Sequence, residues 1–244
     1  MKNGNTCRLC RVASELRESH IIPSSIIRLK RDETLDNRFY ELYNKLNRTI
    51  QDGPKEYLLC DDCEQKIGRY EKYFKEAIHL SRHGIEIKHN AQFAVIDNLD
   101  YSNVKLFFLS LLWRMSISSR PEFENVCIGD EEEAVRKMIV TEEPGKSSEY
   151  SVNAVIPLFN QKMDEGWSTT ALVSESRPTV YAIVIGGILY YMSGTRQNRS
   201  FLPEPFLSGL PELLLNESAR WIKPLADFNS IPCLRSLVEY DSNE

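Results

Sequence analysis

The feature of this sequence that most restricts its fold is a pair of Cys-x-x-Cys motifs. They join Cys7 with Cys10 and Cys60 with Cys63, and so use four of the six cysteines in a chain of 244 residues. Two residues between a pair of cysteines allow one tight turn to present both sulfur atoms to the same metal ion. Structural zinc is held by four such ligands in a tetrahedron. The spacing therefore predicts one structural zinc ion that joins the start of the chain to the segment around residue 60.

The cellular compartment bears on how the cysteines are used, because disulfide bonds persist mainly in oxidising environments. The first residues, MKNGNTCRLC, lack the apolar run of a secretion signal. The apolar stretches at 104–117 and 180–192 are shorter than the roughly 18 residues that span a membrane. We therefore expect a cytoplasmic protein with no membrane segment, in which the paired cysteines bind metal. Four unrelated thiols or two redox pairs are the alternatives, and Cys127 and Cys233 are expected to be buried thiols.

Hydrophobic periodicity predicts a mixture of helices and strands. Apolar residues recur at intervals of three and four along residues 61–82, and residues 103–118 are apolar nearly all round, so both segments are expected to be helices. Three further elements are expected: a short helix at 130–137 with a capping box at Asp130 and Glu133, a strand at 152–159, and a hairpin at 179–193 around Gly186-Gly187. The predicted fold class is α+β.

The charge distribution suggests two parts with different roles. Residues 1–90 carry 17 Lys and Arg against 14 Asp and Glu, whereas residues 91–244 carry 13 against 21. We infer a zinc-binding module at 1–90 and a mixed α+β domain at 91–244 that serves targeting, regulation or partner binding. The acidic second part is suited to a protein partner. The excess of positive charge in the first part is too small to indicate nucleic acid on its own.

The segments around the paired cysteines resemble the HNH endonuclease superfamily, whose core is a ββα-metal fold. The matching segments are Cys7 to Cys10, Ser19-His20-Ile21-Ile22-Pro23 and Leu58-Leu59-Cys60-Asp61-Asp62-Cys63-Glu64. The combined pattern is also similar to a set of prokaryotic proteins that carry this zinc module at their start. The resemblance covers about residues 5–80 and implies that a zinc-stabilised HNH-like module precedes the α+β domain.

The resemblance also implies roles for particular residues. His20 takes the place of the general base that activates water against a phosphodiester bond in nucleic acid. Glu64 takes the place of a ligand to a catalytic Mg²⁺ or Mn²⁺. Two positions depart from the family pattern, because Ser19 replaces an Asp or His ligand and Lys55 replaces an Asn. Glu71, two helical turns after Glu64, is a further carboxylate that either joins the site or lies in solvent.

Two hypotheses for the function follow. In the first, the protein is a metal-dependent HNH-like endonuclease, in a bacterial defence or mobile-element context if the analogy extends that far. In the second, the module no longer binds a catalytic ion and mediates protein or nucleic-acid interactions through its zinc fold. His20 would then only support the zinc cluster by packing or hydrogen bonding.

Overall fold

The computed structural model describes residues 6–27, 38–41, 48–49, 53–80, 87–89, 93–96, 99–159, 162–163, 167–169, 172–173, 180–186, 188–196 and 221–227. Helices and strands both occur along these residues, and the strands form three separate sheets. The α+β fold class expected from the sequence is confirmed. No helix in the described part of the chain is long and apolar enough to span a bilayer.

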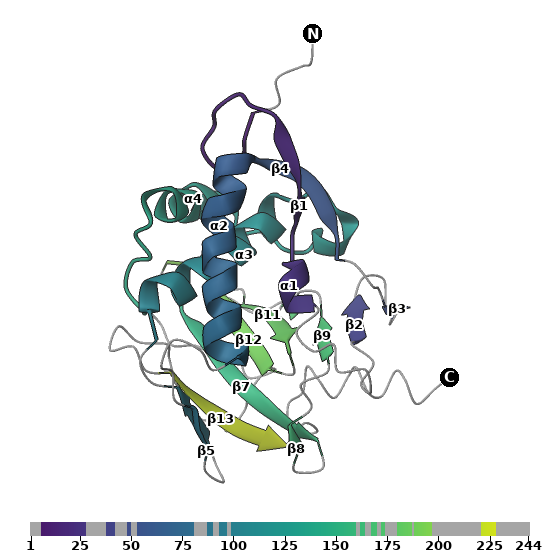
Figure 1. The fold of residues 1–244 in the computed structure, drawn as a ribbon, viewed down its shortest axis with the longest axis vertical. Helices are drawn as coiled ribbons and strands as arrows, with labels where there is room; N and C mark the ends of the chain where they lie inside the picture. Colours follow the sequence, from purple (N-terminus) through teal and green to yellow (C-terminus); the bar gives the residue numbers. More distant parts are fainter. Residues whose placement is uncertain are drawn as a thin grey trace.

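The first part of the chain contains a strand–strand–helix unit. Strand β1 (Leu16–His20) pairs antiparallel with β4 (Lys55–Cys60), and helix α2 (Asp61–Phe74) follows β4 without a break. The register pairs Leu16 with Cys60 and His20 with Lys55, with an irregularity between Arg17 and Glu18. In Figure 1, α2 runs along the long axis of the molecule from this hairpin toward the larger sheet. The end of β1 therefore lies beside α2.

Helix α2 forms where the periodicity predicted a helix. Its buried residues are Cys63, Ile67, Tyr70 and Phe74, which recur every three or four positions and make one apolar face. Asp61, Asp62 and Glu64 lie in its first turn, where negative charge interacts favourably with the helix dipole. A π-helical segment, Lys75–His79, continues the helix. The predicted end near residue 82 lies outside the described residues.

Helix α3 (Tyr101–Ile117) is the most deeply buried helix among the described elements, and every residue from Val104 to Met115 is buried. The helix starts at Asp100, whose side chain accepts a hydrogen bond from the backbone nitrogen of Asn103 at 3.0 Å. It packs against α2, where the rings of Phe74 and Phe107 stack with centroids 4.1 Å apart. The two helices therefore share one core.

Helix α4 (Glu132–Thr141) follows two short 3₁₀ turns, Pro121–Phe123 and Gly129–Glu131. The predicted capping box is wrong, because the residue at the N-cap is Glu131 and it makes no side-chain capping hydrogen bond. Asp130 belongs instead to the preceding 3₁₀ turn. Glu133 is used elsewhere, in an ion pair with Arg136 whose atoms lie 2.8 Å apart.

The largest sheet combines segments that are far apart in sequence. Its strands follow the order β10-β11-β12-β7-β13-β6-β5, and β8 pairs with β7 at the side. The pairing of β7 with β13 is parallel, and the other neighbours are antiparallel. The strands span Leu172–Val173 (β10), Val180–Ile185 (β11), Ile188–Ser193 (β12), Val152–Phe159 (β7), Trp221–Asp227 (β13), Phe93–Ile96 (β6), Ile87–His89 (β5) and Lys162–Met163 (β8).

The predicted strand at 152–159 and the predicted hairpin of β11 and β12 are both confirmed. Gly186 has a φ of +53° at the turn between β11 and β12, a backbone conformation that a residue with a Cβ adopts only with strain. Tyr190 on β12 lies against the α2–α3 aromatic pair, with its ring centroid 5.7 Å from that of Phe74. The sheet thereby connects to the helices through aromatic packing.

The remaining elements are small. Helix α1 (Ser24–Ile27) follows β1, and β2 (Arg38–Glu41) pairs with β3 (Arg48–Thr49) and, in parallel, with β9 (Trp167–Thr169). One apolar core contains buried residues from both sides of residue 90, among them Ile67 and Phe107. The division of the chain into parts at 1–90 and 91–244 stays a prediction.

Candidate functional site

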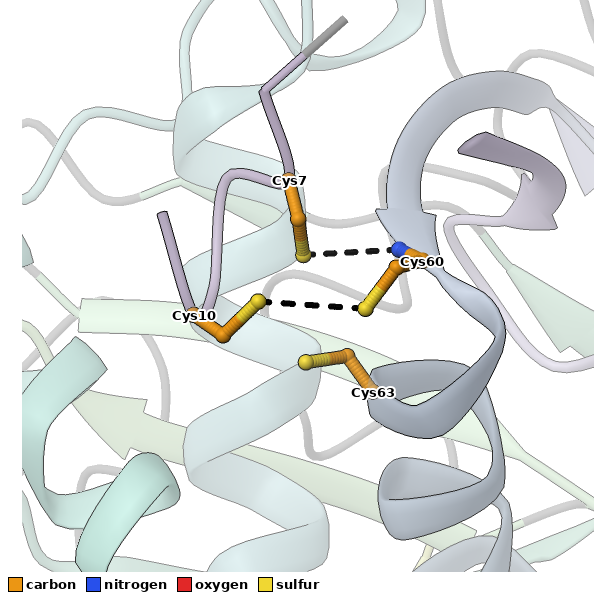
Figure 2. Close-up of side chains that lie close together, drawn as sticks. All are labelled: Cys7, Cys10, Cys60 and Cys63. Atoms are coloured by element: carbon orange, nitrogen blue, oxygen red, sulfur yellow. Dashed lines mark hydrogen bonds between the residues drawn. The ribbon is translucent and has the colours of Figure 1, made fainter. Parts of the chain in front are cut away.

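The four paired cysteines lie together at one end of the strand–strand–helix unit (Figure 2). Cys7 and Cys10 come from the loop before β1, Cys60 ends β4, and Cys63 lies in the first turn of α2. All four sulfur atoms lie within 4.8 Å of one another, so the side chains could hold one metal ion. The prediction that distant Cys-x-x-Cys pairs meet is confirmed.

The spacing of the sulfur atoms fits a tetrahedral metal site. With a zinc–sulfur distance of about 2.3 Å, the edges of a tetrahedron of four sulfurs are about 3.8 Å long. The Sγ atoms of Cys10 and Cys60 are 3.8 Å apart. A disulfide would need about 2.05 Å between its sulfurs, and all four cysteines are free. The donor set and its spacing therefore fit zinc held by thiolates.

The ionisation of these thiols depends on burial and on nearby N–H groups. Burial alone would raise the pKa of Cys7, but hydrogen bonds from the backbone at Cys10, Cys60 and Leu9 outweigh it and lower this pKa to about 7. The backbone nitrogen of Cys60 donates to Cys7 Sγ at 3.4 Å. Burial raises the pKa of Cys10 and of Cys63. Four thiolates this close therefore need a cation among them.

The loop that presents Cys7 and Cys10 is held by backbone hydrogen bonds. The backbone nitrogen of Cys7 donates to the carbonyl of Val12, and that of Arg11 donates to the carbonyl of Cys7, each at 2.9 Å. The backbone nitrogen of Arg8 donates a 2.9 Å hydrogen bond to the carbonyl of Leu58, and this bond connects the loop to β4. Arg11 has a φ of +64°, in the left-handed region that closes the turn. The first pair of cysteines is therefore fixed relative to the second.

Helix α4 braces the same loop from outside the first ninety residues. The Nη1 atom of Arg136 donates a hydrogen bond to the carbonyl of Leu9, which lies between the two cysteines of the first pair. Arg11 forms an ion pair with Glu133 on α4. The cluster is thus supported by α4 as well as by its own loop.

One prediction follows directly from the cluster. Protein purified without added metal is expected to contain about one zinc per chain, because four thiolate ligands complete one tetrahedral site. Elemental analysis against a protein standard measures this ratio. Folded protein with far less than one zinc per chain would rule out the four-cysteine site.

A second group of polar side chains lies where β1 ends beside α2, and we call it the polar site: Ser19, His20, Glu64, Glu71 and Arg114. Ser19 is only 1% exposed, and its hydroxyl donates a hydrogen bond to Glu64 Oε1 on the first turn of α2. His20 is the next residue and the last of β1. His20 and Glu64, the two predicted catalytic residues, therefore lie on β1 and α2. The hydrogen bond from Ser19 to Glu64 connects these two elements.

Glu71 and Arg114 form the buried side of the polar site. The Nη2 atom of Arg114 lies 2.7 Å from Glu71 Oε1, and the two side chains are 2% and 18% exposed. Arg114 Nη1 also donates to the backbone carbonyl of His20 at 2.9 Å. The alternative that Glu71 lies in solvent is wrong, because its side chain is only 18% exposed and paired with Arg114. The alternative that it supplies a second carboxylate to a metal stays a prediction.

Electrostatics show that the members of the polar site act on one another. Burial raises the pKa of Glu71, and the charge and hydrogen bond of Arg114 oppose that rise. The carboxylate of Glu64 also raises this pKa, and His20 lowers it. The carboxyl group of Glu71 therefore responds to charges on both β1 and α2.

Of the two positions that depart from the HNH pattern, Ser19 belongs to the polar site and Lys55 lies on the neighbouring strand β4. Ser19 supports the carboxylate of Glu64, a role that its hydroxyl can fill although serine is a poor metal ligand. Lys55 lies directly opposite His20 in the β1–β4 register, and its Nζ lies 4.0 Å from the carboxylate of Glu18. A lysine beside His20 brings a positive charge to the position that the resemblance gives to an asparagine.

Arg114 was not among the predicted site residues, although the sequence contained a signal. It interrupts a helix that is apolar nearly all round, and a charged residue in such a helix needs a buried partner. The partners, Glu71 and the carbonyl of His20, lie 43 and 94 residues away in sequence, so periodicity could not identify them. The expected burial of Cys127 is wrong, since its side chain is exposed. Cys233 lies outside the described residues.

Comparison with family models, curated proteins and solved structures finds no match to this chain.

Proposed function

We propose that the protein is a zinc-stabilised, HNH-like endonuclease that hydrolyses phosphodiester bonds in nucleic acid. The observation that supports this most is the order of elements around the polar site. His20 ends β1, β4 pairs beside it, and α2 brings Glu64 alongside through the Ser19 hydrogen bond. A strand–strand–helix unit with a histidine at the strand end is the arrangement that the sequence resemblance implies.

In this proposal His20 removes a proton from the attacking water. A general base needs to lie near the reacting atoms and to reach solvent, and His20 is partly exposed while its backbone carbonyl is anchored by Arg114. This hydrogen bond fixes the position of the strand end that carries His20. Lys55, opposite His20 in the register, would bring positive charge toward the phosphate.

The oxygen donors of the polar site fit a hard divalent ion. Mg²⁺ binds through one or two carboxylates together with water and substrate phosphate oxygens. Glu64 would supply the carboxylate and Ser19 orients it. When bound, such an ion supplies charge stabilisation at the phosphate. The cysteine cluster is the one group of three or more close metal-ligating side chains found in the described part of the chain, so this ion would depend largely on water and substrate for its remaining ligands.

The zinc ion has a supporting role in the proposal. Cys60 and Cys63 stand at the junction of β4 with α2, and the relative placement of those two elements sets where Glu64 lies. A closed site of four thiolates leaves no open position for water or substrate. Zinc would therefore act on the polar site only by holding its scaffold.

The second hypothesis, a zinc-binding module without catalysis, is favoured by one observation. Arg114 already neutralises Glu71, so only one carboxylate of the polar site remains for a divalent ion. In that version the zinc fold would display a surface for a protein or nucleic-acid partner. The two hypotheses differ in whether Glu64 has a metal-dependent role.

The test compares Glu64→Gln with wild type in a nucleic-acid cleavage assay over a range of Mg²⁺ and Mn²⁺ concentrations. We expect the variant to lose about 10²-fold or more in rate, with partial recovery at high metal concentration because weaker ion binding is offset by mass action. Asp62→Asn is the matched control, since it removes an exposed carboxylate from the same helical turn. Equal rates for Glu64→Gln and Asp62→Asn would remove Glu64 from the mechanism.

A further inference from the structure

A groove runs along α2 on the side that carries the polar site. It has a volume of about 450 Å³ and is lined by Gly68, Glu71, Lys72 and Lys75 from the helix, by Ser25 from α1 and by Leu80 beyond the π-helical segment. Glu76 also borders it. Glu71 belongs both to the groove and to the polar site, so the groove adjoins the polar site at this residue.

Gly68 determines how open this groove is. Glycine in the middle of a helix is less stable than alanine, so its presence needs a reason. Packing does not supply one, because a Cβ placed on Gly68 would meet no atom within 4 Å. Residues three and four apart share a helix face, so Gly68 lies between Glu64 and Glu71. Its missing side chain leaves backbone and open space next to the polar site.

The charges around the groove favour an anionic ligand. The side chains of Lys72 and Lys75 make no hydrogen bond or ion pair with another residue in the described part of the chain. Of the two carboxylates in the lining, Glu71 is engaged by Arg114 and Glu76 also has an interaction partner, so the two lysines are the charges left to meet a ligand. Leu80, which lies beyond the π-helical segment, is 40% exposed and adds an apolar surface to the lining of the groove. Two lysines with an apolar side chain suit a phosphodiester backbone whose neighbouring base is unpaired.

We propose that this groove binds a single-stranded segment of nucleic acid next to the bond that is cleaved. Lys72 and Lys75 contact its phosphates, Leu80 contacts a base, and the backbone at Gly68 lets the strand approach Glu64. A groove of this volume has room for about one nucleotide unit rather than for a duplex. This inference rests on the proposed function and adds to it the class of substrate.

The test uses the full chain and fluorescent oligonucleotides, with binding followed by anisotropy without added divalent ions so that no cleavage intervenes. Gly68→Leu is expected to raise Tm, because leucine favours helix, and yet to weaken binding of an oligothymidine or oligouridine strand about tenfold or more. Gly68→Ala should also raise Tm, with a smaller loss of binding. A Gly68→Leu variant that melts at a higher temperature and yet binds the strand more weakly has lost binding because its groove is filled. A misfolded variant would instead show a lower Tm.

The lysines are tested through the salt dependence of binding. The double variant Lys72→Ala/Lys75→Ala is expected to reduce the slope of log affinity against log salt by about 1.4, since each phosphate contact on a single strand contributes about 0.7. The control is Lys137→Ala/Lys146→Ala, which removes the same charge from exposed residues outside the groove. Equal slopes for the two double variants would overturn the proposal.

Three other results would also overturn it: wild-type binding by a folded Gly68→Leu variant, no binding of single strands by wild type, or tighter binding of duplex that the groove variants leave unchanged. Cleavage assays with Mn²⁺ separate this inference from the proposed function. If wild type cleaves and the groove variants cleave equally well, the endonuclease proposal stands and the groove is wrong. If groove variants lose binding while wild type never cleaves, the groove stands and the endonuclease proposal is wrong.

Discussion

Replacing Cys60 by alanine is expected to release zinc and unfold the β1–β4–α2 unit. Cys60 is one of the four clustered cysteines, the last residue of β4 and the N-cap of α2. Zinc binding to structural sites contributes about 10–16 kcal/mol in small zinc peptides, which matches or exceeds the total stability of a typical domain, about 5–15 kcal/mol. Losing one of the four ligands should remove enough of the zinc-binding free energy to leave the β1–β4–α2 unit without a stable fold.

Zinc content and a far-UV circular dichroism melt measure this effect together. Cys127→Ala is the control, because Cys127 is an exposed cysteine outside the cluster. The control should keep its zinc and its Tm. A Cys60→Ala protein that retains one zinc and melts with wild type would show that the cluster does not support the fold.

The second large effect is expected from Arg114→Met, which should destabilise the protein by about 3–5 kcal/mol. The substitution leaves the buried carboxylate of Glu71 without its cation and the carbonyl of His20 without its donor. Methionine keeps much of the side-chain volume, so the loss is mainly electrostatic. Urea unfolding measures it, and Arg17→Ala is the control because its ion pair with Asp61 is exposed and contributes about 1 kcal/mol or less.

A double variant tests whether the charge on Glu71 is the cause. Adding Glu71→Gln to Arg114→Met removes the uncompensated carboxylate, so part of the lost stability should return. A double variant no more stable than Arg114→Met would show that the arginine acts through packing alone.

The dependence of stability on pH should also change. Burial holds the folded pKa of Glu71 above its usual value, and Arg114 lowers it. A carboxyl with a raised folded pKa binds its proton more tightly in the folded state, so its contribution favours folding at low pH and is lost as the pH rises through the folded pKa. Arg114→Met raises that pKa further. Its deficit relative to wild type should therefore grow as the pH rises above the folded pKa of Glu71 in the wild-type protein, and a deficit that shrinks with rising pH would contradict this account.

The parts of the structure that local sequence determines were predicted well. The Cys-x-x-Cys spacing needs only a tight turn at each pair, and the three–four periodicity of Ile67, Tyr70 and Phe74 needs only one buried face. Both were found where expected. The hairpin of β11 and β12 was also predicted, because its turn and its two apolar strands are adjacent in sequence.

Features that depend on distant partners were missed. Strand β7 was predicted, but its parallel pairing with β13, whose residues lie some seventy positions later (Leu225 with Ile156), could not be read from either segment. The capping box at Asp130 was expected from a local pattern and is absent because a 3₁₀ turn occupies that place. The role of Arg114 could not be predicted from its own apolar helix, since it depends on partners in β1 and α2.

Of the candidate site, the four clustered cysteines were identified from motif spacing, whereas His20 and Glu64 were named only because of the resemblance to HNH endonucleases, and their roles stay predictions. The hydrogen bond from Ser19 to Glu64 and the position of Lys55 opposite His20 depend on strand register and on the packing of β1 against α2.

The most direct test of the endonuclease proposal is His20→Ala, with zinc content and cleavage rate measured on the same preparation. His20 is not among the four clustered cysteines, so the variant should retain about one zinc per chain and the wild-type fold. It should lose about 10²–10⁴-fold in the Mg²⁺- or Mn²⁺-dependent cleavage rate, the usual effect of removing a general base. Wild-type protein that cleaves neither single-stranded nor duplex nucleic acid with any divalent ion, or a His20→Ala variant that cleaves as fast as wild type, would contradict the proposal.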